Sequence, residues 1–178
     1  MLHFSSWTNE NTLTLITIIG AALAGLLAWR QWVRQIKLQR SEFVKQLIEK
    51  LLFDDAVADA AYLIDYNPSW YTAEFHSGSE KHIERKVDKY LTYLSYLCYL
   101  IETNSVTKKE IQLFEYELTR TMRSISVQAY LWNLVHFSKK FGIEYSCRIL
   151  VDYGIRRNVI DEDFLTNNEN KFPKYLDF

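Results

Sequence analysis

Hydrophobic and polar positions divide the chain into two kinds of segment. Residues 11–29, NTLTLITIIGAALAGLLAW, form an unbroken run of 19 uncharged residues. A helix rises about 1.5 Å per residue, so this run would span roughly 29 Å, close to the ~30 Å hydrocarbon core of a bilayer. After residue 30, apolar positions recur every three or four residues among charged ones, which is typical of amphipathic helices. The pattern therefore predicts one transmembrane helix followed by a helical domain.

A cleaved signal peptide and a buried core helix are the alternatives for the apolar run. A signal peptide carries a basic segment before its apolar stretch, whereas residues 1–10 contain no Lys or Arg. A core helix of a soluble protein has a polar face, and here only three threonines, all near one end, interrupt the apolar surface. We therefore interpret residues 11–29 as a true membrane span.

The charges on either side of the span predict its orientation. No Lys or Arg precedes it, and six follow between residues 30 and 50. Basic residues that flank a span stay on the cytoplasmic side, so we expect an outside N-terminus and a cytoplasmic C-terminal domain. The basic residues nearest the span are also expected to bind anionic lipid at the bilayer surface. They are Arg30, Arg34, Lys37 and Arg40.

The chain after the span is expected to be all-α. Residues 30–53 contain neither Gly nor Pro, which predicts a basic helical stalk that continues the span without a break. We expect a cytoplasmic bundle of about five helices at 54–154 and a loose polar tail at 155–178. Residues 1–10 would form the short extracytoplasmic N-terminus.

Start and stop signals place the helices of the bundle. Asp54 can cap one helix, and Thr107 begins a capping-box pattern for another. Gly142 and Gly154 predict C-terminal stops. The expected helices span residues 54–66, 80–103, 108–123, 126–141 and 145–153.

The helix at 80–103 is expected at the centre of the bundle. From residue 90 to residue 100 it reads YLTYLSYLCYL, which is apolar or aromatic on nearly every side and typical of a helix surrounded by others. Its tyrosines, at 90, 93, 96 and 99, recur every third residue and therefore spiral around the helix. The following helix is expected to bury a face that ends at Ile125.

Small residues in the span predict self-association. Gly20 with Ala24, and Ala21 with Gly25, form two small-xxx-small pairs that permit close helix approach in a bilayer. Stalk positions Phe43, Leu47 and Leu51 would extend such a contact. We therefore expect a homo-oligomer or a protein partner, in addition to the lipid bilayer.

Two carboxylates are the strongest candidate for chemistry. Asp55 and Asp59 lie one helical turn apart, which would suit a divalent cation or paired acid–base work. Acids are also common at helix N-termini for electrostatic reasons alone, and we favour that explanation.

Other chemical signals are weak or missing. The chain has no Gly-rich phosphate loop, nucleophile elbow or metal-ligand spacing of His and Cys. Cys98 and Cys147 are expected to remain reduced thiols, and His136 has no ligand partner at helical spacing. A net charge of −1 argues against a nucleic-acid partner. We expect no catalytic, cofactor-binding or metal-binding residues and do not expect an enzyme.

Aromatic and helical landmarks resemble a known family. The stretches NPSWYTAEFHSGSE, VDKYLTYLSYLCYL, KKEIQLFEYELTRTM, VQAYLWNLVHFSKKFG and ILVDYG are similar to a family of small bacterial single-pass membrane proteins whose helical cytoplasmic domain has no assigned reaction. The resemblance covers most of residues 30–155 and includes no catalytic signature. It implies a location in the bacterial inner membrane and supplies no functional residues.

Three functions from different classes are therefore open. The leading hypothesis is a membrane-anchored interaction or scaffold module that concentrates a partner, or itself, at the cytoplasmic face. The first alternative is a stress or phage-defence effector that acts on the membrane, suggested by the small-residue face of the span. The second is a metal-dependent hydrolase that uses Asp55 and Asp59.

Overall fold

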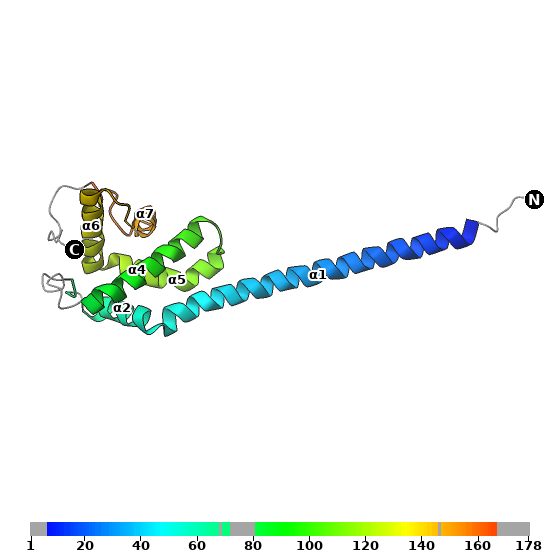
Figure 1. Cartoon of the computed structure of the whole chain (residues 1–178), viewed down its shortest axis with the longest axis horizontal. Coiled ribbons are helices and arrows are strands. Elements are labelled where there is room, and N and C mark those ends of the chain that lie inside the picture. Colours follow the sequence, from blue (N-terminus) through cyan, green and yellow to red (C-terminus); the bar gives the residue numbers. More distant parts are fainter. Residues whose placement is uncertain (1–6, 68, 72–80, 146, 167–178) are drawn as a thin grey trace, which may run out of the picture. The chain divides into compact units, whose positions relative to one another are not determined.

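The computed structural model describes residues 7–67, 69–71, 81–145 and 147–166. Within these ranges it contains six α-helices and no strand (Figure 1), which confirms the predicted all-α class. The chain divides into two compact units, residues 1–46 and 47–178. The helices are α1 (Trp7–Phe53), α2 (Asp55–Tyr66), α4 (Lys81–Glu102), α5 (Lys108–Arg123), α6 (Ile125–Phe141) and α7 (Arg148–Arg156).

Helix α1 is one continuous element of 47 residues. It joins the predicted span to the predicted stalk without a break, because no proline interrupts it and its two glycines are tolerated inside the helix. Its last two turns, from Leu47 onward, belong to the second unit. Among the described residues α1 is the one helix that is long and apolar enough to cross a membrane.

Apolar side chains in the N-terminal part of α1 are exposed on every side. Leu23 and Leu26, for example, are 57% and 61% exposed. The hydroxyl of Thr17 donates to the backbone carbonyl of Leu13 at 2.8 Å, so its polarity is satisfied within the helix. The rings of Trp29 and Trp32 lie 5.2 Å apart near the first basic residue.

The break between α1 and α2 is produced by Asp54, as predicted. Its carboxylate accepts the backbone amide of Ala56 at 3.1 Å and that of Val57 at 3.4 Å. An N-cap of this kind satisfies amides that have no partner inside the helix. Helix α2 ends at Tyr66.

Helix α4 is the centre of the second unit and packs against both α2 and α7 (Figure 1). Leu91 and Leu94 are fully buried. The predicted spiral of tyrosines is confirmed: Tyr90 and Tyr93 are buried, while the tyrosines at 96 and 99 are exposed. One helix therefore presents both a core face and a surface face.

Caps define α5 and α6. Thr107 and Glu110 form the predicted capping box at the start of α5. Ser124 ends α5 and also caps α6 through its hydroxyl. Because Ser124 separates the two helices, Ile125 begins a new element and is 75% exposed, so its predicted place in the core is wrong. Gly142 adopts a left-handed φ of 65° and ends α6 as expected.

The end of α7 differs from the prediction. The helix runs through Gly154 to Arg156, so this glycine is not a stop. A Cβ at residue 154 would lie 2.7 Å from the Ile160 side chain and 2.9 Å from the Met122 sulfur. Gly154 therefore allows close packing, and its position near a polar tail made it resemble a C-cap.

The described part of the predicted tail also packs. Ile160 and Phe164 are only 2% and 6% exposed. Residues 155–166 thus differ from the loose tail expected from the sequence, because two apolar side chains pack into the core although most of their neighbours stay exposed. Residues 167–178 lie outside the described residues.

Candidate functional site

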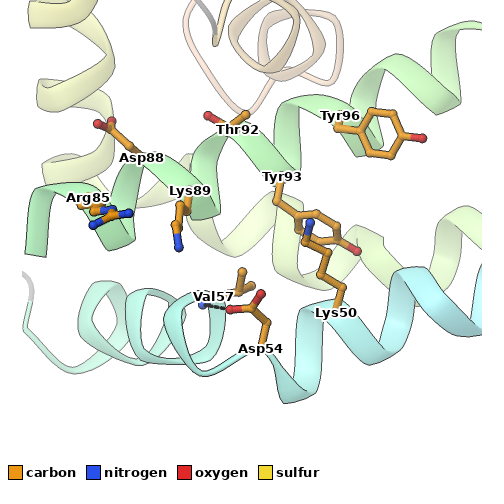
Figure 2. Close-up of a pocket in the computed structure, with 9 residues that line it drawn as sticks. All are labelled: Lys50, Asp54, Val57, Arg85, Asp88, Lys89, Thr92, Tyr93 and Tyr96. Carbon is orange, nitrogen blue, oxygen red and sulfur yellow. Dashed lines mark hydrogen bonds between the residues drawn. The ribbon is translucent and has the colours of Figure 1, made fainter. Parts of the chain in front are cut away.

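A cleft of about 500 Å³ lies in the second unit, where the last turns of α1 and the start of α2 face α4 (Figure 2). Its volume falls within the range of roughly 300–1,000 Å³ that is common for small-ligand sites. Charged and aromatic side chains predominate in its lining. The lining residues are Lys50, Asp54, Val57, Arg85, Asp88, Lys89, Thr92, Tyr93 and Tyr96.

Helical spacing on α4 brings most of these residues together. Arg85, Lys89 and Tyr93 are four residues apart from one to the next, so they share one face of the helix. Figure 2 shows the Lys89 side chain directed toward α2 and the Tyr93 ring directed toward the end of α1. The break at Asp54 then places the end of α1 and the start of α2 along this face.

The cleft holds three cationic side chains. Lys50 lies over the Tyr93 ring, with its Nζ 5.7 Å from the ring centre. Arg85 and Lys89 are exposed and form no ion pair with any residue in the described ranges. All three cations therefore retain charge that no carboxylate of the described chain neutralises through a salt bridge.

Both carboxylates of the cleft already have hydrogen-bond donors. Asp54 caps α2 through the amides of Ala56 and Val57. Asp88 accepts the hydroxyl of Tyr130 at 2.5 Å. Burial raises the pKa of the Asp88 carboxyl, and the Tyr130 hydrogen bond opposes that rise.

Tyr93 links the two sides of the cleft. Its hydroxyl donates to the backbone carbonyl of Leu47 and so ties the end of α1 to α4. Burial raises the pKa of Tyr93 above its ordinary value, so the hydroxyl remains protonated and able to donate. Lys50 lies about one turn further along α1 and lines the same cleft.

The surroundings of His136 and Cys98 do not favour nucleophilic chemistry. The His136 ring lies 3.7 Å from the Trp132 ring, and its Nδ1 meets the Trp132 carbonyl at 2.8 Å. Cys98 is buried, which raises the pKa of its thiol and disfavours the thiolate. The cations that line the cleft are suited to contact with an anion.

The predicted lipid-binding residues are not part of this cleft. Arg30, Arg34, Lys37 and Arg40 are all exposed on α1 in the first unit. At about 100° per residue the first three fall within a 60° arc, so they form a narrow basic face along the helix.

The predicted self-association residues are also exposed on α1. Gly20, Ala21, Ala24 and Gly25 are all open to the surroundings. No atom outside the helix backbone lies within 4 Å of the Cβ position at either glycine. The extension of this contact by Leu47 and Leu51 does not follow, because these two side chains are buried in the second unit.

The carboxylates suggested for a metal have other partners. Asp59 forms an ion pair with Lys86, with its Oδ2 2.5 Å from the lysine Nζ. Asp55 is exposed in the first turn of α2, where it suits the helix dipole. The described residues contain no group of three or more His, Cys, Asp or Glu that could hold a metal ion.

The cleft was not predicted from the sequence. The spacing of Arg85, Lys89 and Tyr93 is visible in the sequence and could have indicated a shared face. The contribution of Lys50 could not be found in this way, because it depends on how the end of α1 packs against α4.

Comparisons with protein-family models, with curated proteins and with solved structures give no match to this chain. The resemblance to a family of bacterial single-pass proteins therefore remains an expectation from its sequence landmarks, and the geometry of the molecule carries the functional argument.

Proposed function

We propose that this protein is a membrane-anchored helical interaction module. In this proposal α1 crosses the bacterial inner membrane once, with the N-terminus outside, and the second unit gathers a protein partner or a second copy at the cytoplasmic face. The observation that supports it is the joining, in one 47-residue helix, of an exposed apolar segment to a compact helical unit.

The exposed apolar surface of α1 motivates the membrane placement. Leu, Ile and Trp side chains in the first unit are mostly more than half exposed. Burial of one such side chain is favourable by about 1.5–3 kcal/mol, so a segment of this kind is strongly stabilised by a bilayer. The basic face that follows would then lie at the cytoplasmic headgroups.

Cysteine accessibility tests the anchor and its orientation. Asn9→Cys and Ser41→Cys place thiols on either side of the apolar segment, while the native cysteines are buried. We expect a membrane-impermeant maleimide to label the Asn9→Cys variant in intact spheroplasts and the Ser41→Cys variant only after permeabilisation. The reverse labelling would contradict the orientation, and release of the protein by alkaline carbonate would contradict the anchor.

Cross-linking in membranes tests self-association. Combined Gly20→Leu and Gly25→Leu substitutions fill the small-residue face and should lower the cross-linked dimer fraction several-fold. Ala22→Leu is the control, because residue 22 is exposed and lies about 130° around α1 from the centre of the small-residue face. A dimer fraction that falls equally in both variants, or in neither, would contradict packing through this face.

The open sides of Gly20 and Gly25 also favour a second candidate, an effector that assembles in the membrane and damages it. Overproduction should then collapse the membrane potential, and the Gly20→Leu, Gly25→Leu variant should be harmless at the same protein level. Normal growth and potential with the wild-type chain would exclude this second function.

A further inference from the structure

We propose that the cleft between α1, α2 and α4 binds a small organic anion that carries phosphate. Arg85 and Lys89, one helical turn apart, would hold the phosphate. Lys50, which Figure 2 shows beside the Tyr93 ring, and Tyr96 lie further along the cleft and would contact the remainder of the ligand. This inference goes beyond the interaction module proposed above and does not depend on whether α1 crosses a membrane.

Several cations of the second unit are ion-paired, whereas those at one end of the cleft form no ion pair among the described residues. Arg120 lies 2.6 Å from both Asp65 and Glu117, and Lys86 pairs with Asp59. Arg156 likewise contacts Glu102. By contrast, Arg85 and Lys89 have no carboxylate partner in the described ranges, although they lie one turn apart and repel each other.

The chemistry of Arg85 and Lys89 fits phosphate. An arginine presents a planar fork that can donate two parallel hydrogen bonds to phosphate oxygens, and a lysine adds a compact point charge. Asp54 and Asp88 keep their negative charge while they accept hydrogen bonds from backbone amides and from the Tyr130 hydroxyl. Three cations against two carboxylates still leave the lining with one net positive charge. A bound phosphate would also relieve the repulsion between Arg85 and Lys89.

The remainder of the lining indicates that the ligand is larger than inorganic phosphate. The cleft volume is about 500 Å³, far more than one phosphate group occupies. Tyr96 is 46% exposed and offers an aromatic face for stacking. Tyr93 acts as a positioning residue, since its hydroxyl is already bonded to the Leu47 carbonyl.

Two sources could supply such an anion, a soluble phosphate ester or a phospholipid headgroup. The full chain is therefore placed in nanodiscs of phosphatidylcholine and titrated by calorimetry with ATP and with pyrophosphate at constant ionic strength. In parallel, thermal unfolding is compared between nanodiscs of phosphatidylcholine alone and nanodiscs that also contain phosphatidylglycerol. A soluble source predicts binding in the titration, and a lipid source predicts a higher melting temperature with phosphatidylglycerol.

The decisive variant combines Arg85→Gln and Lys89→Gln. Both side chains are exposed, so the variant should fold, and far-ultraviolet circular dichroism checks that it does. Lys109→Gln with Arg123→Gln removes the same charge from exposed positions on α5 and serves as the matched control. Loss of two charge-assisted contacts should weaken binding by about tenfold or more in the first variant and leave the control near wild type.

Arg85→Lys provides a second measure, because it keeps the charge and removes the planar fork. We expect binding of intermediate strength. Equal weakening by both charge-matched double variants would show non-specific attraction and overturn the proposal. Absence of any response in both the titration and the lipid comparison would also overturn it, without bearing on whether α1 anchors the protein.

Discussion

Helices α1 and α4 are both rich in apolar residues, yet the surroundings of those residues are opposite. In the N-terminal part of α1, Leu23 is 57% exposed, whereas Leu91 and Leu94 of α4 are fully buried. Helix α4 has neighbours, because α2 and α7 pack against it. The N-terminal part of α1 has no described side chain with that degree of burial before residue 44. Apolar composition alone thus does not show whether the apolar side chains of a helix are buried by other parts of the chain.

The same contrast separates two kinds of stability. Folding of the second unit is driven by burial of its own apolar side chains. The apolar side chains in the N-terminal part of α1 can be removed from water only by molecules outside the chain's described contacts. Changes in α4 and its neighbours should therefore alter unfolding of the domain, and equivalent changes in the N-terminal part of α1 should not. Matched pairs of substitutions in the full chain, measured in one detergent, test this division.

Leu94→Ala should have the largest effect. It removes a fully buried side chain from the centre of α4, and such changes destabilise by about 2–5 kcal/mol through lost burial and the cavity that remains. Leu23→Ala makes the same chemical change at an exposed position of α1. Thermal unfolding followed by circular dichroism should show a marked loss for the first variant and almost none for the second. Comparable losses would break the proposed separation.

Buried hydroxyls extend the comparison to polar groups. Thr121 is 1% exposed and its hydroxyl lies 2.8 Å from that of Tyr90. Thr121→Val keeps the shape and leaves the buried Tyr90 hydroxyl without this partner, which should cost about 1–3 kcal/mol. Thr17→Val in α1 removes only a bond to its own helix backbone. The unfolding midpoint of the Thr17→Val variant should stay at the wild-type value. An equal shift in the two variants would contradict the proposed difference between the two regions.

Glycine substitutions test packing in the two regions. Gly154→Ala would bring a Cβ within 2.9 Å of Met122 and closer still to Ile160. We expect a loss of about 1–2 kcal/mol, because strain from overpacking exceeds the gain in helix propensity. Gly25→Ala meets no atom within 4 Å and should not lower the unfolding temperature. A stabilised Gly154→Ala variant would show that the Ile160 side chain moves aside freely.

Gly154 also illustrates what the sequence could and could not predict. Helix bounds set by local hydrogen bonds were predicted well, because Asp54 and the Thr107 capping box act on neighbouring amides. Gly154 looked like a helix stop. Its role depends instead on contacts with Ile160 and Met122, both of which lie outside its own helix. Ile125 was misplaced because Ser124 acts as a cap for two helices at once.

The candidate cleft was hidden for the same reason. Arg85, Lys89 and Tyr93 share a helical face that is visible in the sequence. Lys50 lies beside them because the end of α1 packs against α4, where the Tyr93 hydroxyl donates to the Leu47 carbonyl. The predicted surfaces, by contrast, lie along a single helix, so spacing was enough to propose them. The residue spacing within one helix thus predicts which side chains share a face of that helix. Which faces of different helices meet to form a site is decided by tertiary packing.

The smallest effect, and the only one that depends on pH, is expected for Tyr130→Phe. Residues 11–29 contain no titratable side chain, so pH dependence of unfolding should come from outside the predicted span. Burial raises the pKa of Asp88 above its ordinary value, while the Tyr130 hydroxyl lowers it. A raised folded-state pKa means that this group favours folding most below its unfolded pKa, and that the benefit is lost as the pH rises through the folded pKa.

Removal of the Tyr130 hydroxyl should raise the Asp88 pKa further and enlarge that loss. The cost of Tyr130→Phe should therefore be small at about pH 3, where Asp88 is protonated, and grow to about 1 kcal/mol near pH 7, where the bond involves a carboxylate. Unfolding midpoints at the two pH values measure the change, and Tyr62→Phe, at a position 65% exposed, is the control. A cost that is equal at both pH values would place the contribution of Tyr130 in its packing alone, and a cost that is larger at low pH would reverse the assigned direction of the Asp88 shift.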